Sequence, residues 1–145
     1  MEDQINFFTE EVDFNTEQIN NTKAWVNQVI ENEGFELEEI NFIFCSDEYL
    51  HKINVEYLDH DTYTDVITFD NSDTAGFIES DIFISIERII ENAKTHEQSF
   101  DHEVKRVIIH GVLHLLGYKD KSEQEASLMR TKENEAIALF EKSFA

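Results

Sequence analysis

The stretch HGVLHLLGYKD, residues 110–120, decides how the C-terminal half of this 145-residue chain is built. Its apolar residues have a helical period, and Gly117 is suited to the left-handed conformation that commonly ends a helix. Residues i and i+4 lie on one face of a helix, so His110 and His114 can direct their rings at one point. If the chain doubles back at Gly117, Asp120 returns to the same point. The spacing therefore predicts an apolar helix that ends beside three polar side chains.

Two imidazoles and a carboxylate at one point are suitable ligands for a divalent cation, above all zinc. The spacing His-x3-His-x2-Gly-x2-ligand is that of the extended zinc signature of metzincins, whose third ligand is normally a histidine. We therefore predict one zinc ion held by His110, His114 and Asp120, with manganese or another divalent metal as an alternative because one ligand is a carboxylate. Without a metal, the histidines would be ordinary polar groups and the aspartate a helix cap.

The residue after the first histidine separates this pattern from that of the zincin proteases. Those enzymes carry a glutamate there as general base, whereas this chain has Gly111. A cation with three protein ligands and one open position still lowers the pKa of a bound water, so hydrolysis remains available. A metal-dependent hydrolase of peptides or small molecules is therefore one alternative, and Gly111 argues against it.

Composition limits the class of protein further. The chain has 11 basic and 32 acidic residues, which gives a formal net charge of −21. Clear periodic patterning indicates a folded chain, and its length is that of one domain, so we expect a single domain over residues 1–145. The negative charge repels phosphate backbones at long range. An RNA substrate would need local attraction from a bound dication and nearby basic side chains.

The sequence also suggests where the protein works. Cys45 is the only cysteine, so no internal disulfide can form, which fits a reducing compartment. The first residues lack a basic segment followed by an apolar core, and no run of eighteen apolar residues occurs. We therefore expect a cytoplasmic protein with no membrane anchor and no membrane partner.

Hydrophobic periodicity predicts the order of the elements. Strands are expected near residues 5–8, 39–45, 66–69 and 77–84, and a turn at 71–76 joins the last two as a hairpin. Helices are expected over about 16–33, 46–57, 85–96, 99–116 and 122–144, the last beginning with a Ser122–Glu125 capping box. This order predicts an α+β fold: one small mixed sheet of about four strands covered by about five helices, with a zincin-like metal helix.

With these residues in view, the chain resembles the YbeY family, bacterial rRNA-maturation factors that are metal-dependent endoribonucleases. Its residues 110–118, HGVLHLLGY, match the family core His-Gly-x-Leu-His-Leu-x-Gly-Tyr. Residues 64–69, TDVITF, resemble the family's Thr-Asp-Val-Leu-Ser-Phe, and Asp81 and Ile82 stand where its Gly-Asp-Ile falls. Asn54 and Tyr57 fit the helix that precedes these motifs. The resemblance spans roughly residues 38–140.

The resemblance implies a substrate and partners. It implies an endoribonuclease that cleaves single-stranded RNA during maturation of the 3′ end of the small-subunit rRNA precursor, as part of ribosome biogenesis. Because the protein is acidic and ribosomal proteins are basic, small-subunit ribosomal proteins are expected partners. A non-catalytic ribosome assembly factor with a structural metal is the second alternative.

Four features depart from the family pattern. Asp120 replaces the third histidine, and Leu58 replaces the arginine that the family places after its tyrosine to engage RNA phosphate. Ser80 replaces the glycine of Gly-Asp-Ile, while Tyr63 and Asp70 replace the prolines that flank the Thr-Asp-Val strand. The missing arginine bears most on catalysis, and it is the feature that favours the assembly factor.

Phosphate chemistry needs a cation beyond the metal, because charge develops on the phosphate as it reacts. Arg106, one turn before His110 on the same face, is the candidate for a catalytic role of this kind. Lys119 and Lys121, which flank Asp120, are candidates for binding the substrate. For each of them, an ordinary surface charge is the alternative.

Two aspartates are candidates for acid–base or orienting roles. Asp65 and Asp81 could each orient a ligand histidine or accept a proton. Asp65 could equally cap a turn at the start of its strand. The sequence does not decide between these roles.

Overall fold

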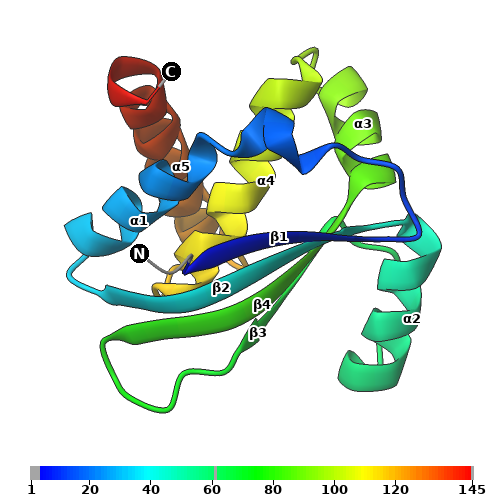
Figure 1. Ribbon diagram of the computed structural model, residues 1–145, viewed down its shortest axis with the longest axis horizontal. Helices are drawn as coiled ribbons and strands as arrows, with labels where there is room; N and C mark the ends of the chain where they lie inside the picture. The colour runs from blue at the N-terminus through cyan, green and yellow to red at the C-terminus, as the bar shows by residue number, and fades with distance from the viewer. Residues whose placement is uncertain (1–3, 61, 145) are drawn as a thin grey trace.

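A four-stranded sheet flanked by helices makes up the part of the chain that the computed structural model describes, residues 4–60 and 62–144. The elements follow the predicted order, which confirms the α+β fold (Figure 1). None of the helices in these residues is long and apolar enough to cross a bilayer. The elements are β1 (Ile5–Glu10), α1 (Thr22–Asn32), β2 (Glu36–Cys45), α2 (Asp47–Leu58), β3 (Val66–Asp70), β4 (Phe77–Ser85), α3 (Ile86–Thr95), α4 (Phe100–Leu115) and α5 (Glu123–Ser143).

The sheet is mixed, with the strand order β1-β2-β4-β3. β1 pairs with β2 and β2 with β4 in parallel, whereas β3 and β4 pair antiparallel. The antiparallel pair is the hairpin predicted from the turn at residues 71–76. Because β1 and β3 stand at the two ends of this order, each has one edge with no strand partner in the described part of the chain.

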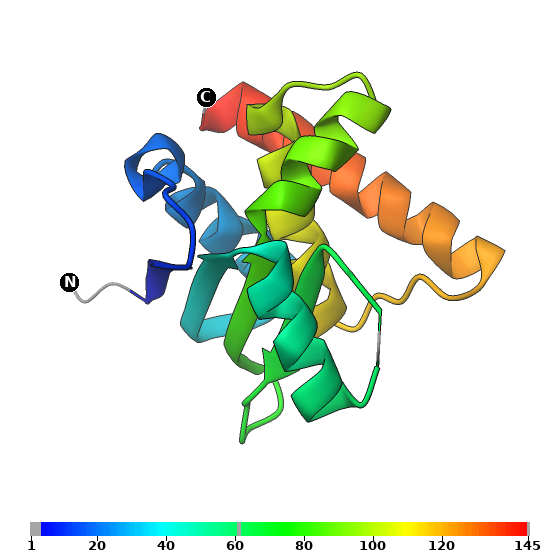
Figure 2. The ribbon, with the colours of Figure 1, turned by 90° about the vertical axis from the view of Figure 1, so that its right-hand side faces the viewer.

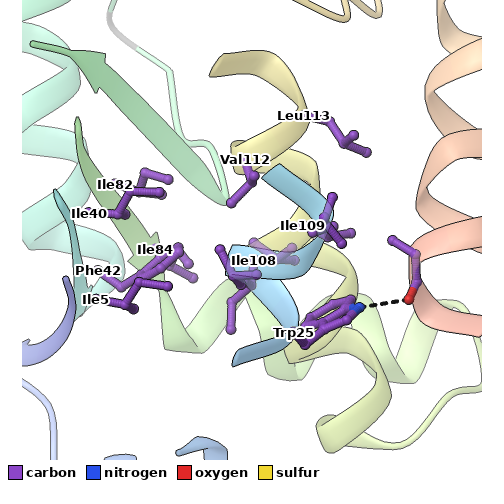
Figure 3. Close-up of a cluster of buried hydrophobic side chains, with 14 of the residues drawn as sticks. Ile5, Trp25, Ile40, Phe42, Ile82, Ile84, Ile108, Ile109, Val112 and Leu113 are labelled. Atoms are coloured by element: carbon purple, nitrogen blue, oxygen red, sulfur yellow. Dashed lines mark hydrogen bonds between the residues drawn. The ribbon is translucent and has the colours of Figure 1, made fainter. Parts of the chain in front are cut away.

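Helices cover both faces of the sheet, and each face has its own apolar cluster. On the face covered by α1 and α4, Ile82 of β4 belongs to one cluster with Ile108 and Trp25 (Figure 3). α2 covers the other face (Figure 2), where Leu50 and Ile67 are buried together. Alternation of apolar residues along a strand therefore assigns each side chain to one of two helix layers.

Trp25 joins α1 to α5 inside the first cluster. Its ring is fully buried, and its Nε1 donates a 2.7 Å hydrogen bond to the main-chain carbonyl of Ala136 (Figure 3). The ring also packs edge-on against Phe140, with the centroids 5.3 Å apart. A buried N–H without an acceptor costs about 1–3 kcal/mol, so this bond helps to fix the position of α5 against the core.

The first helix is shorter than predicted from residues 16–33. A 3₁₀ turn at Thr16–Ile19 comes first, and α1 begins only at Thr22. The hydroxyl of Thr22 donates a buried 2.6 Å hydrogen bond to the carbonyl of Ile19. The prediction of one continuous helix is therefore wrong, because a local side-chain bond competes with the helical main-chain pattern at this point.

Gly111 lets α4 approach the sheet closely. A Cβ atom at this position would lie 3.3 Å from Ile82 Cγ2, 3.4 Å from Thr68 Cγ2 and 3.5 Å from Val66 Cγ2. With no side chain there, the helix packs directly against β3 and β4. His110, the preceding residue, is thereby held beside the edge strand β3.

Replacing Gly111 with leucine is expected to destabilise the fold. The new side chain must displace the methyl groups of Ile82, Thr68 and Val66, and overpacking of this kind costs about 1–3 kcal/mol. Urea titration at fixed pH should show the free energy of unfolding falling by that amount. Ala126→Leu, at an exposed position of α5, is the control and should change little. Equal effects of the two substitutions would contradict this packing of α4.

Candidate metal centre

His110 and His114 stand one turn apart near the C-terminal end of α4. Their Nε2 atoms are 3.1 Å apart, and the planes of the rings make an angle of 79°. Both side chains are partly exposed, by 24% and 30%. The i, i+4 spacing therefore brings two imidazole nitrogens to one point that solvent can reach.

The chain reverses directly after this pair. Gly117 has a φ of +106°, in the left-handed region that favours glycine. Its N–H donates a 3.1 Å hydrogen bond to the carbonyl of His114, and the N–H of Tyr118 donates one of 3.1 Å to the carbonyl of Leu113. These two bonds form a Schellman motif, which satisfies carbonyls at the end of the helix. The predicted reversal at Gly117 is confirmed.

Asp120 returns to the two histidines. Its Oδ2 lies 3.3 Å from Nε2 of His110 and 3.4 Å from Nε2 of His114. Around a tetrahedral ion with bonds of about 2.0–2.1 Å, neighbouring ligand atoms are roughly 3.3 Å apart, so the donor set and its spacing fit zinc. Nowhere else in the described residues do three His, Cys, Asp or Glu side chains form such a group.

Glu133 of α5 holds the other nitrogen of His110. Its side chain is only 5% exposed, and its Oε2 lies 2.6 Å from Nδ1 of His110. A carboxylate at this distance accepts a hydrogen bond from Nδ1, which leaves Nε2 free to bind a cation. The second oxygen, Oε1, accepts a 2.8 Å bond from Nη1 of Arg106. One buried carboxylate thus sets both the tautomer and the orientation of a proposed ligand.

The contact between His110 and Glu133 shifts the pKa of both side chains. Burial lowers the pKa of His110, but its hydrogen bond to Glu133 and the nearby negative charge outweigh burial and leave that pKa above the ordinary 6.5. Burial raises the pKa of Glu133, but hydrogen bonds from His110 and Arg106 outweigh it and leave that pKa below the ordinary 4.5. Glu133 is therefore a carboxylate at neutral pH.

Sequence reasoning missed Glu133, although its position carries a signal. It lies within the buried stripe of α5, where a charged residue stands among apolar ones at helical spacing. A charged side chain inside an apolar stripe must find a partner, since burying it unpaired is costly. The other buried residues of α5 are Met129, Ala136, Ile137 and Phe140.

Arg106 has a different place from the one predicted. It does lie one turn before His110, but both ends of its guanidinium are engaged: Nη1 by Glu133 and Nη2 by Asn134 Oδ1 at 3.0 Å. Its side chain is 15% exposed. The hypothesis that Arg106 compensates for phosphate charge is therefore corrected, because its charge is paired with the carboxylate that holds His110.

The two candidate aspartates lie in different surroundings. Asp65 lines the same cavity as His110, and its Oδ2 accepts a 3.2 Å hydrogen bond from Asn92. Asp81 neighbours Ile82 on β4 and so points to the opposite face of the sheet from α4, where it accepts a 3.0 Å bond from Asn41. Asp81 is therefore excluded from orienting a ligand histidine, and Glu133 rather than Asp65 occupies that position.

An open cavity of about 540 Å³ surrounds the three proposed ligands. Lys121 lines it, whereas Lys119 is exposed and is not among its lining residues. Leu58, at the place of the family's arginine, lines the cavity with an apolar side chain. The residue is 39% exposed. The other lining residues are Asn54, His60, Thr62, Thr64, Asp65, Val66, Ile67 and Thr68.

The remaining departures from the family pattern have local explanations. Ser80 is buried, and its hydroxyl donates a 2.7 Å bond across the hairpin to the carbonyl of Phe69. The hydroxyl of Tyr63 donates a 2.9 Å bond to Glu48. Asp70 accepts a 3.0 Å bond from the main-chain N–H of Ser72 at the start of the turn. Each substitution therefore makes a hydrogen bond that glycine or proline cannot make with a side chain.

Fold and centre together define a class: small α+β proteins in which a helical His-x3-His pair, a reversal at glycine and a carboxylate meet in an open cavity. Comparison with known proteins identifies the family. The model of the family described as Endoribonuclease YbeY matches residues 4–141. The chain belongs to this family, which is one of metalloenzymes, and the resemblance found in the sequence is confirmed.

The similarity covers nearly the whole chain. Endoribonuclease YbeY of Christiangramia forsetii is 53% identical over 137 residues, 94% of this chain and 94% of that protein. Endoribonuclease YbeY of Flavobacterium johnsoniae is 52% identical over 133 residues, 92% of this chain and 95% of that protein. The solution structure of TM1509 from Thermotoga maritima matches with a TM-score of 0.64 at 25% identity. The match covers 95% of this chain and 92% of that chain.

Glu133→Gln is expected to weaken zinc binding about 10–100-fold. The amide cannot supply the negative charge that makes the His110 ring a better ligand and holds its Nε2 towards the ion. Competition with a chromophoric chelator at neutral pH measures the affinity. The control is Glu135→Gln on the same helix, where the side chain is 63% exposed and the affinity should not change. Equal affinities of wild type and Glu133→Gln would contradict the orienting role.

The stability that the His110–Glu133 contact gives the metal-free protein should depend on pH. Because the pKa of His110 is raised, its contribution is fully present below pH 6.5 and is lost as the pH rises through the raised pKa. Because the pKa of Glu133 is lowered, its contribution is fully present above pH 4.5 and is lost as the pH falls through the lowered pKa.

The difference in unfolding free energy between wild type and Glu133→Gln should therefore be largest between pH 4.5 and 6.5 and shrink at higher pH. Urea titrations at several pH values, with chelator present, measure this difference. A difference that grew as the pH rose above 6.5 would contradict the assigned pKa of His110.

Proposed function

We propose that this protein is a cytoplasmic, single-domain, metal-dependent endoribonuclease that cleaves single-stranded precursor rRNA. Its proposed role is maturation of the 3′ end of the small-subunit rRNA during ribosome biogenesis. The observation that carries the proposal is the triangle of His110, His114 and Asp120 in an open cavity, in a chain of the Endoribonuclease YbeY family. A metal held by these side chains would be accessible to an extended substrate in the cavity.

Zinc is the proposed ion, held by His110, His114 and Asp120. Two neutral imidazoles and one carboxylate give the ligand set a charge of −1, which also tolerates manganese better than three histidines would. When bound, the ion would supply Lewis-acid stabilisation of phosphate charge and an acidified water. Everything else in the cavity must come from the chain's own side chains.

Those side chains have distinct proposed roles. Glu133 keeps Nδ1 of His110 protonated and the ring in place. Asp65, in the cavity wall and held by Asn92, is the proposed proton acceptor. Lys121 is the proposed contact for a substrate phosphate, because it lines the cavity and Arg106 is already paired.

The acidic surface bears on how the substrate arrives. A net charge of −21 opposes the approach of free RNA at long range. We propose that basic ribosomal proteins of the small subunit bring the protein to its substrate. The metal and Lys121 then act at short range, where the distant charges are largely screened by salt.

A ribosome assembly factor without catalysis is the second candidate, and Leu58 favours it because the cavity lacks the family's arginine. Peptide hydrolysis fits less well. A side chain at position 111 would point at the methyl groups of Ile82, Thr68 and Val66. Gly111 therefore cannot act as the general base of a zincin protease. A glutamate at this position would also point into the sheet and not towards the proposed metal.

One assay separates these functions. Zinc-loaded wild type and a His114→Ala, Asp120→Ala double variant are incubated with single-stranded RNA and with a peptide library. We expect RNA cleavage by wild type that stops on chelation and is absent from the double variant, with no peptide cleavage. Glu135→Gln, remote from the cavity lining, is the control and should cleave as wild type does. Equal cleavage by wild type and the double variant, or none by either, would overturn the enzymatic proposal.

A further inference from the structure

One wall of the cavity is the open edge of a strand. β3 stands at the end of the sheet (Figure 1). Residues 64–68 line the cavity together with His110, His114 and Asp120. Main-chain groups at a free strand edge have no partner within the sheet and can bind an extended ligand. The orientation of these groups in β3 therefore matters for the substrate.

The pairing of β3 with β4 fixes which groups face outward. The N–H of Ser85 donates to the carbonyl of Asp65 at 3.0 Å, and the N–H of Asn71 donates to the carbonyl of Glu79 at 2.8 Å. In an antiparallel ladder, alternate residues bond to the partner strand and those between them face away. The odd-numbered residues from 65 to 71 therefore bond to β4.

The even-numbered residues Val66, Thr68 and Asp70 direct their N–H and C=O groups to the open side. Their main-chain groups form no hydrogen bond with any other described residue. Val66 and Thr68 both line the cavity that holds the proposed ligands. Two donor–acceptor pairs are thus presented in a row, at a fixed spacing and beside the metal centre.

The charges around the cavity indicate what kind of contact a nucleic acid can make there. Lys121 is the single lysine or arginine among its described lining residues, which also include Asp65 and Asp120. A strand of RNA therefore finds few partners for its phosphates. Its bases, in contrast, offer donors and acceptors on their edges when they are unstacked. Leu58 and His60 in the same lining add surfaces that a base can pack against.

We infer that the outward main-chain groups of Val66 and Thr68 bind the base edges of single-stranded RNA beside the metal centre. This inference rests on the proposed function and deepens it, since it assigns base recognition to the backbone of β3 and not to a cluster of basic side chains. A duplex could not offer the Watson–Crick edges of its bases in this way, because those edges are already paired. The open edge therefore selects single strands.

Thr68→Pro tests the inference most sharply. Proline removes the outward N–H without taking a bond from the β3–β4 ladder, and prolines are accepted in edge strands at such positions. Binding of a fluorescein-labelled 12-nucleotide single-stranded RNA, with phosphorothioate linkages that resist cleavage, to the zinc-loaded protein is followed by anisotropy. We expect about tenfold weaker binding, equivalent to ~1.4 kcal/mol. Thr68→Val keeps the N–H and the side-chain shape, and should bind as wild type does.

Amide hydrogen exchange in the wild type gives a second measurement, which does not depend on how Thr68→Pro folds. Adding the RNA should slow exchange at Val66 and Thr68. Exchange at Ile67 and Phe69, already bonded to β4, should not change. Such protection of alternate residues is specific to a ligand on the strand edge.

Several outcomes would overturn the inference. RNA that binds without slowing exchange at Val66 and Thr68, equal affinity for a folded Thr68→Pro, or equal loss in Thr68→Val would each do so. Protection by a basic peptide, with none by RNA, would assign the edge to a protein partner instead. These results are distinct from failure of the proposed function, which would show as absence of metal-dependent cleavage by the wild type.

Discussion

The chain reversal at Gly117 is the constraint on which the site depends. Without it, α4 would carry two imidazoles and nothing to complete a ligand set. A φ of +106° and two main-chain bonds turn the chain so that Oδ2 of Asp120 lies within 3.4 Å of both rings. The same turn leads into α5, whose Glu133 reaches the opposite nitrogen of His110. One backbone conformation thus leads both to Asp120, a proposed ligand, and to the carboxylate that orients His110.

The buried carboxylate of Glu133 ties the site to the core. A buried charge is costly unless it is paired and hydrogen-bonded, and here His110 and Arg106 both supply bonds. α5 is in turn held against α1 by the bond from Trp25 to Ala136. Contacts that lie away from the cavity therefore support the geometry of the proposed ligands.

Local features of the site could be predicted from the sequence, whereas features set by packing could not. His110, His114, Gly117 and Asp120 lie within eleven residues, so helix periodicity and one turn define their arrangement. The role of Glu133 depends on how α5 crosses α4, which no spacing reveals. The prediction that Asp81 orients a ligand histidine is wrong. Alternation along a strand shows that neighbouring side chains point to opposite faces, but it does not show which face α4 covers. β2 begins earlier than predicted because a register shift between Leu37 and Glu39 breaks its alternation.

We propose that the side chains of His110, His114 and Asp120 hold one ion. Crystals of the zinc-loaded protein measured at the zinc absorption edge test it most directly. We expect a single anomalous peak about 2.0–2.1 Å from Nε2 of His110, Nε2 of His114 and Oδ2 of Asp120, with one coordination position left open to the cavity. A peak elsewhere, or an ion bound by the histidines while Asp120 points away, would contradict it.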